Sequence, residues 1–247
     1  MSPIPHTFHY RACANALSAN FTRPFAHNLE IQAPISLPTI GGHGHSTVEN
    51  FRFREFVSFK RAYTHVSGSQ AEDGSYNTLV IASVEGLNIL DVVTADRVVA
   101  RIRSKHSKDA AESDISLAGS KFENLKISCC PAKVELDFDL FESILTFEKA
   151  KAQLGKIRQI AGAARGNDHT PIACTCIKEL KVDCPGVKPE RHGFHVDGFG
   201  NIFLGEVMIK HGEKTLTMIR LELGSAVAGS GTVVEASSNG SPWPPTK

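Results

Sequence analysis

The fold is decided by residues 202–223, which read IFLGEVMIKHGEKTLTMIRLEL. Apolar and polar residues alternate on both sides of the central His-Gly-Glu, and a period of two is the signature of half-buried β-strands. We therefore expect strands over residues 202–210 and 214–223, joined as a hairpin with its turn at Gly212. One face of the second strand would carry Thr217, Ile219, Leu221 and Leu223.

The same alternation appears in two other regions. Residues 77–90 and 92–104 place apolar residues opposite a row of arginines, and residues 133–140 place apolar residues opposite a row of acids. A chain of 247 residues is long enough for one large β domain. The expected fold class is mostly β, an antiparallel sandwich or barrel.

One segment shows a helical period instead. Apolar residues at spacings of three and four form a single stripe, which predicts one helix near residues 141–163. The residues of this stripe are Phe147, Ala150, Leu154, Ile157 and Ala161.

Four phenylalanines between residues 51 and 59 change parity along the chain. They are Phe51, Phe53, Phe56 and Phe59. A parity change suits a bulged strand or one helical turn, and the strand-rich context favours the bulged strand.

Prolines set the expected boundaries. The first 40 residues hold Pro3, Pro5, Pro24, Pro34 and Pro38. Each proline removes a backbone donor and disfavours helix before it, so we expect residues 1–40 to form an extended N-terminal arm or an edge strand. Residues 41–235 would form a single β-rich domain, and residues 236–247 a flexible tail rich in Gly, Ser and Pro.

Composition excludes some classes of partner. Lys and Arg total 27 against 26 Asp and Glu, so the formal net charge of +1 gives no global attraction to nucleic acid or anionic membranes. No apolar run reaches the roughly 18–20 residues of a transmembrane helix. Residues 1–17 are interrupted by polar side chains and do not read as a signal peptide, so the cytoplasm is the default expectation.

The most metal-like motif is Gly-Gly-His-Gly-His at residues 41–45. His43 and His45 are separated by one residue and would point to the same side of a strand, where both could reach one divalent ion. Further ligands could come from His65, from His192 and His195, or from the acidic row. The alternative is an exposed glycine-rich loop, and no other cofactor is expected.

The acidic row and the cysteines allow more than one interpretation. Glu135, Asp137 and Asp139 could bind Ca²⁺, or could form a solvated face opposite a row of arginines. Two cysteine-containing segments could supply thiolates to zinc, form a disulfide in an exported protein, or hold buried free thiols. The cysteines of these segments are Cys129, Cys130, Cys174, Cys176 and Cys184.

No catalytic motif stands out. The chain has no serine elbow between glycines, no phosphate-binding loop and no dinucleotide fingerprint between a strand and a helix. The glycine-rich residues 224–231 lie between two predicted strands and are interpreted as a hairpin connection.

Residues 77–128 carry a recurring text. It runs VEGLNIL from Val84, VTADRV from Val93 and AGSKFENLKI from Ala118. This resembles bacterial β proteins of the choice-of-anchor P type, in which such elements form tight corners between strands. The resemblance implies a bacterial surface or secreted protein, and it implies no activity.

These observations favour a non-enzymatic β module that binds a partner or self-assembles as a homo-oligomer, through the arm, the tail or an uncovered edge strand. The alternative is a metal-dependent enzyme that uses His43 and His45 on the β scaffold. A third hypothesis, a carbohydrate-binding sandwich, is disfavoured because the chain has one Trp and three Tyr.

Overall fold

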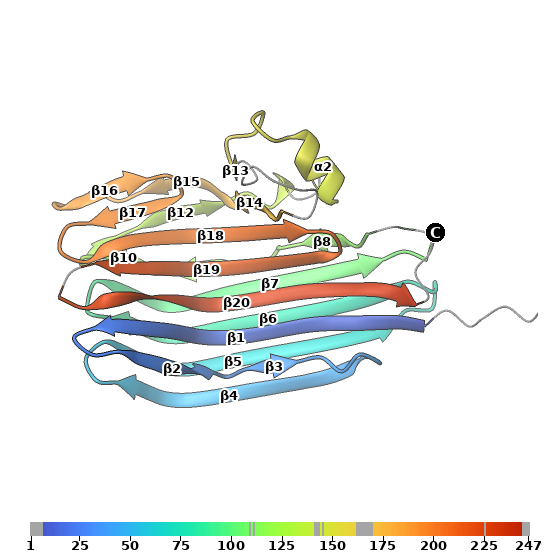
Figure 1. Ribbon diagram of the computed structural model, residues 1–247, viewed down its shortest axis with the longest axis horizontal. Helices are drawn as coiled ribbons and strands as arrows, with labels where there is room; N and C mark the ends of the chain where they lie inside the picture. Colours follow the sequence, from blue (N-terminus) through green and yellow to red (C-terminus); the bar gives the residue numbers. More distant parts are fainter. Residues whose placement is uncertain are drawn as a thin grey trace, which may run out of the picture.

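A computed structural model describes residues 7–243, except 109, 111, 141–143, 145, 162–169 and 225. Two large antiparallel sheets pack face to face as a β-sandwich, which confirms the expected fold class (Figure 1). No helix in the described part of the chain is long and apolar enough to cross a membrane.

Ten of the described strands form the first sheet. Its order is β13 (Ile160–Ala161), β14 (Ile172–Thr175), β18 (Gly200–Lys210), β19 (Glu213–Gly224), β20 (Ala228–Trp243), β1 (Thr7–Arg23) and β2 (His27–Gln32). The short strands β3 (Ile35–Ser36), β17 (Gly193–Val196) and β16 (Val187–Glu190) pair with β1, β18 and β17 respectively. The predicted hairpin at residues 202–223 is therefore confirmed as β18 and β19.

Eight of the described strands form the second sheet. Its order is β11 (Cys130–Pro131), β10 (Lys126–Ile127), β7 (Val93–His106), β6 (Tyr76–Ile89), β5 (Val57–Gln70) and β4 (Gly42–Phe53). The strands β8 (Asp114–Ser116) and β9 (Lys121–Glu123) also pair with β7. A small third sheet, β12 (Lys133–Leu136) with β15 (Ile177–Lys181), lies at one side of the sandwich (Figure 1).

The core lies between the central strands of the two sheets, where β1 and β20 contact β5, β6 and β7. Inward positions alternate along these strands as the sequence predicts. Fully buried examples are Val80, Ala82 and Val84 on β6, Val98, Ala100 and Ile102 on β7, and Ala236 on β20.

A row of irregular residues, which we call the irregular row, crosses the first sheet. The pairing of β18, β19, β20 and β1 skips one residue on each strand at the same level, at Gly205, Met218, Val234 and Ala16, and the register is the same on both sides of the row. The set of positions that faces the core changes from odd to even, or the reverse, at this row. Thr217 consequently bonds Glu235 on the outer face, whereas Ile219 is buried in the core, so the prediction that they share a face was wrong.

The ends of the chain differ from the expected arm and tail. Residues 7–23 form β1, which pairs with β20 from Thr7 and Trp243 to Arg23 and Ala228. The prolines lie outside this strand, so none of them interrupts its ladder. Most of the predicted tail belongs to β20, and residues 1–6 and 244–247 lie outside the described residues.

The helix is shorter than predicted. Helix α2 (Phe147–Ala152) begins after Thr146, whose side chain accepts a hydrogen bond from the Lys149 N–H at 3.2 Å. Gly155 has a φ of 74°, and this left-handed backbone stops the helical turn from continuing. Of the expected range 141–163, residues 141–143, 145, 162 and 163 lie outside the described residues.

The phenylalanine-rich segment is a hairpin rather than one strand. β4 ends at Phe53 and β5 starts at Val57, with the Phe56 N–H bonded to the Phe53 carbonyl across the turn. The ladder of these two strands is also interrupted at Asn50, where φ is 53°, and at the opposite Lys60, without a shift of register. The turn explains the change of parity after Phe53.

Candidate functional site

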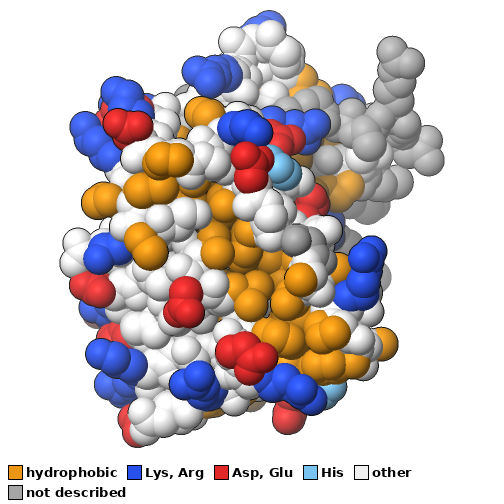
Figure 2. Space-filling view, turned by 90° about the vertical axis from the view of Figure 1, so that its left-hand side faces the viewer, with side chains coloured by type: hydrophobic (Ala, Val, Ile, Leu, Met, Phe, Trp, Pro, Cys, Tyr) orange, Lys and Arg blue, Asp and Glu red, His pale blue; other side chains and the backbone are white. Residues whose placement is uncertain are grey.

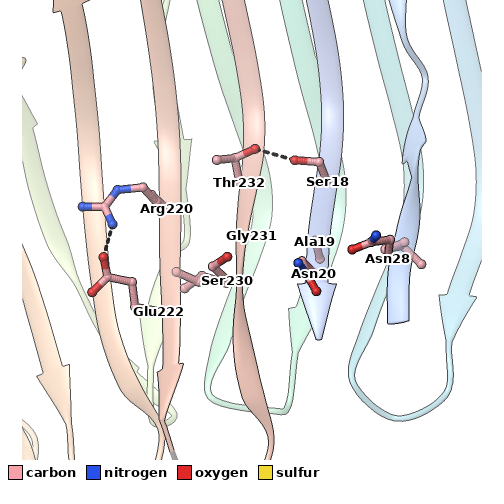
Figure 3. A pocket seen from close by; sticks show the side chains of 11 residues that line it. Ser18, Ala19, Asn20, Asn28, Arg220, Glu222, Ser230, Gly231 and Thr232 are labelled. Carbon is pink, nitrogen blue, oxygen red and sulfur yellow. Dashed lines mark hydrogen bonds and ion pairs between the residues drawn. The ribbon is translucent and has the colours of Figure 1, made fainter. Parts of the chain in front are cut away.

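A groove of about 560 Å³ crosses the outer face of the first sheet, between the irregular row and the end of the sheet at which β1 ends and β20 begins. Its side chains come from β19, β20, β1 and β2, which are distant in sequence and adjacent in the sheet (Figure 3). The residues that line it are Ser18, Ala19, Asn20, Asn28, Leu29, Arg220, Leu221, Glu222, Ser230, Gly231 and Thr232. We call this feature the groove.

Strand register explains why the surface is hollow. Ala19 of β1 and its partner Gly231 of β20 stand on the core side of the sheet, so on the outer face these two strands carry only the short side chains of residues 18, 20, 230 and 232 along the groove. A Cβ atom on Gly231 would lie 2.8 Å from the Ser18 carbonyl oxygen, so this close approach of the two backbones requires glycine. The floor of the groove is therefore largely backbone.

The walls carry short hydrogen-bonding side chains. Ser18 and Thr232 pair across the strands and their hydroxyl oxygens lie 2.9 Å apart. On the other side of the floor, Asn20 pairs with both Ser230 and Asn28, and these three side chains are exposed. The walls thus offer hydroxyl and amide groups that can both donate and accept.

One end of the groove is charged but internally neutralised. Arg220 binds both oxygens of Glu206, with Nε–Oε2 at 2.5 Å and Nη2–Oε1 at 2.9 Å, and it also pairs with Glu222 (Figure 3 shows the latter pair). The guanidinium lies 4.0 Å above the Phe203 ring, and His192 bonds Glu206 at 3.0 Å. Such bidentate and stacked contacts fix the arginine in one orientation.

The Glu206 carboxylate is held ionised. Burial alone would raise the pKa of Glu206, but hydrogen bonds from His192 and Arg220 outweigh it and lower that pKa to about 2. Glu206 is therefore ionised at neutral pH and stays paired with Arg220 across the irregular row, so that Arg220 forms a rigid wall of the groove.

Hydrophobic side chains gather at the nearby end of the sandwich, the face seen in Figure 2. Phe21, Phe25, Phe53 and Phe56 form a ring cluster with centroids 5.3–6.5 Å apart, and Arg54 lies 4.2 Å above the Phe25 ring. These rings close the core at this end, and they do not line the groove.

The predicted metal ligands lie elsewhere. His43 and His45 are exposed on β4, the edge strand of the second sheet, on the opposite side of the sandwich from the groove. His45 pairs with His65, whereas His43 pairs with Ser67, and His192 and His195 belong to the first sheet. Across the residues that the structure describes, no group of three or more His, Cys, Asp or Glu side chains is placed to hold a metal ion.

The acidic row does not face the arginines. Glu135 pairs with Lys178 at 2.7 Å, and Asp137 accepts hydrogen bonds from the Leu140 N–H and from Gln159. Local partners therefore satisfy the carboxylates of Glu135 and Asp137.

The cysteines form a disulfide rather than a zinc site. Cys130 and Cys184 are bonded, which removes two of the four proposed thiolates. Cys174 and Cys176 are buried, and burial raises the pKa of both thiols, so they stay protonated at neutral pH. Of the three interpretations, the disulfide and the buried thiols both hold.

The sequence did not identify the groove. Five of its lining residues are Ser, Asn or Gly, which read as turn or loop residues when taken one at a time. One signal was available: Ser-Ala-Asn at residues 18–20 and Ser-Gly-Thr at residues 230–232 are small polar triplets inside strand patterns. Only the pairing of β1 with β20 shows that they face each other.

Comparison with known proteins gives one match. Residues 8–161 match the model of a family described as Domain of unknown function (DUF8256). This range contains every strand of the second sheet, from β4 to β11, and also β1 and β2, which form one side of the groove. No curated protein and no solved structure matches the chain.

Proposed function

The chain belongs to the DUF8256 family, and from this premise we propose that it is a non-enzymatic binding module whose ligand occupies the groove. The observation that carries the proposal is a hollow of about 560 Å³ with hydrogen-bonding walls and a backbone floor. Ligand sites commonly have volumes of about 300–1,000 Å³ and a few convergent polar groups.

The chemistry of the walls favours a neutral ligand. Arg220 and Glu222 are the ionisable residues of the lining, and they are paired with each other, while Arg220 is also paired with Glu206. A charged ligand would have to displace these bonds, which are worth more than a neutral hydrogen bond. Hydroxyl and amide groups can instead bond Ser18, Asn20 and their neighbours without breaking an ion pair.

The same pairing supports a binding role over a catalytic one. A general base needs a free lone pair within hydrogen-bond reach of its proton, and the carboxylates beside the groove already accept bonds from Arg220. The serine and threonine hydroxyls of the lining bond one another or face solvent rather than a histidine.

Neutral disaccharides test the proposal because they match the groove in size and in hydroxyl content. Two-dimensional amide NMR spectra would be recorded with maltose, cellobiose and N,N′-diacetylchitobiose at millimolar concentration. We expect at least one of them to shift the amide signals of residues 18–20 and 230–232. Absence of any shift for all three would contradict the proposed ligand class.

A blocking variant locates the binding. Ser230 is exposed on the wall, so Ser230→Trp should fill the groove without entering the core and should abolish the shifts. The matched control is Ser69→Trp, an exposed serine on β5 of the second sheet, which should bind as the wild type does. Binding that survives Ser230→Trp would place the ligand elsewhere.

A further inference from the structure

The second sheet has one covered edge and one open edge. At the covered edge, β7 pairs with β8, β9 and β10. At the open edge, β4 pairs with β5, and in the described part of the chain no other backbone hydrogen bond involves residues 42–52. A row of backbone donors and acceptors along β4 is therefore free to pair with another strand.

The open edge also lacks the usual protection. Proteins guard edge strands with proline, lysine or an early bulge. Residues 42–49 contain neither proline nor lysine, and their pairing with β5 is regular until the interruption at Asn50. The exposed large hydrophobic residues of the described part, Ile31 at 50% and Ile40 at 90%, belong to β2 and to the approach to β4, which lie on the same side of the sandwich (Figure 1).

We propose that β4 pairs antiparallel with β4 of a second copy of this chain, with Ser46 facing its own counterpart on a two-fold axis. Identical edges are self-complementary under a two-fold rotation, which is the commonest symmetry of soluble homo-oligomers. The pairing joins the two second sheets into one continuous sheet and leaves the groove, on the first sheet, open to its ligand.

The regular stretch of β4, residues 43–49, fixes the register of the proposed pair. Side chains of β4 alternate between an exposed outer row at positions 43, 45, 47 and 49 and a half-buried inner row at 44, 46 and 48. Paired residues of antiparallel strands point to the same face, so outer positions must meet outer positions. Centring the pair on Ser46 uses every position from 43 to 49, whereas a centre at 45 or 47 carries part of the ladder past the ends of this stretch.

The side chains agree with this register. His43 stands opposite Glu49 of the partner subunit, twice by symmetry, and an imidazole N–H can donate to that carboxylate. Gly44 stands opposite Val48 of the partner subunit, so the smallest inner residue meets the branched one. Opposite charges or hydrogen-bonding pairs at such positions stabilise a sheet modestly.

Cysteine cross-linking tests the axis. Residues directly opposite each other have Cβ atoms about 4.5–5.5 Å apart, which a disulfide can close with a small shift. In a Cys13→Ser, Cys129→Ser background, which removes the exposed thiols, Ser46→Cys should give a covalent dimer on mild oxidation. The matched control Val48→Cys should not, because its counterpart lies across from Gly44.

Two further experiments complete the test: light scattering measures the mass in solution, and substitutions that change the charges at positions 43 and 49 test the register. The wild type should have about twice the chain mass of 26.7 kDa. His43→Glu and Glu49→Lys should each weaken the dimer roughly tenfold, and the double variant should restore it. A monomeric wild type overturns the proposal, and so does a dimer that Ser46→Cys fails to cross-link. Neither result bears on ligand binding in the groove, which the disaccharide titration decides.

Discussion

The Nζ atom of Lys214 lies 2.7 Å from Oε2 of Glu112, and the side chain of this lysine is 2% exposed. Both charges lie at the end of the sandwich away from the phenylalanine cluster, and Glu112 also accepts the Phe147 N–H that begins α2. A buried pair of this kind contributes little relative to an apolar pair, but removing one partner leaves an uncompensated charge.

Glu112→Gln should therefore destabilise the fold strongly. The ammonium of Lys214 would stay buried without a counter-charge, at a cost of about 3–5 kcal/mol. Urea unfolding at neutral pH measures this change. The matched control is Glu135→Gln, which breaks the Lys178 pair at the same 2.7 Å distance on the surface and should leave the midpoint nearly unchanged. Equal effects of the two variants would contradict the assignment.

His106 should make the fold sensitive to mild acid. Burial first, and the nearby Lys214 second, lower the pKa of His106 below its usual value of 6.5, while Asp114 opposes them. The folded state therefore resists protonation, and stability falls as the pH drops below 6.5, because the unfolded chain takes up the proton first. Nε2 of this ring is also buried, and the described residues provide no hydrogen-bond partner for it.

His106→Phe removes the titrating group and keeps a ring against Phe8, whose centroid lies 5.1 Å away. The variant should lose less stability than the wild type between about pH 6.5 and 5. Urea midpoints measured across that window test the prediction. Parallel curves for the two proteins would show that His106 does not carry the effect.

Arg220→Lys should weaken the charged end of the groove. Lysine cannot bind both oxygens of Glu206 or stack on Phe203 as the guanidinium does, so we expect a loss of about 1–2 kcal/mol at neutral pH. Glu206 has a pKa near 2 when folded and a usual value of 4.5, so its contribution exists above pH 4.5 and disappears as the pH falls towards 2.

The difference between Arg220→Lys and the wild type should shrink over the same acidic range. Carboxyl NMR titration gives the second readout, because the variant should raise the pKa of Glu206 towards its usual value. An unchanged Glu206 titration would show that His192 alone holds the carboxylate ionised.

Strand alternation was enough to predict the hairpin of β18 and β19 and the two strands β6 and β7, because each strand buries one face. It failed where the pattern changes within a strand. Thr217 was assigned to the same face as Ile219 because the irregularity at Met218 leaves no mark in the alternation of apolar and polar residues. The irregular row becomes visible only when four strands are seen side by side.

The groove and the disulfide were harder to predict for a topological reason. Residues 18–20 and 230–232 are neighbours because β1 returns to pair with β20, and a contact across the whole chain has no local signal. The same holds for Cys130 and Cys184, which lie 54 residues apart. The predicted arm failed differently: the count of prolines was right, but their positions leave residues 7–23 free to form a strand.

The Cys130–Cys184 bond should be a major stabilising link. It joins β11 of the second sheet to the loop before β16 of the first, and closing a loop of this length contributes about 2–4 kcal/mol by restricting the unfolded chain. The Cys130→Ser, Cys184→Ser variant should lose that amount in urea unfolding, and dithiothreitol should produce the same loss in the wild type. Cys129→Ser, a change to the adjacent exposed thiol, is the control and should leave stability unchanged.

Thiol counting decides whether this loss comes from the bond itself. Denatured, unreduced protein should show four thiols, from Cys13, Cys129, Cys174 and Cys176. Six thiols would mean that the bond does not form, and the reductant should then have no effect on the wild type. Suppose that the wild type shows four thiols and that dithiothreitol does not change the stability of the Cys130→Ser, Cys184→Ser variant. The loss of stability in that variant then comes from losing the disulfide between the two sheets, because the loop that the disulfide closes is the remaining difference between the variant and the wild type.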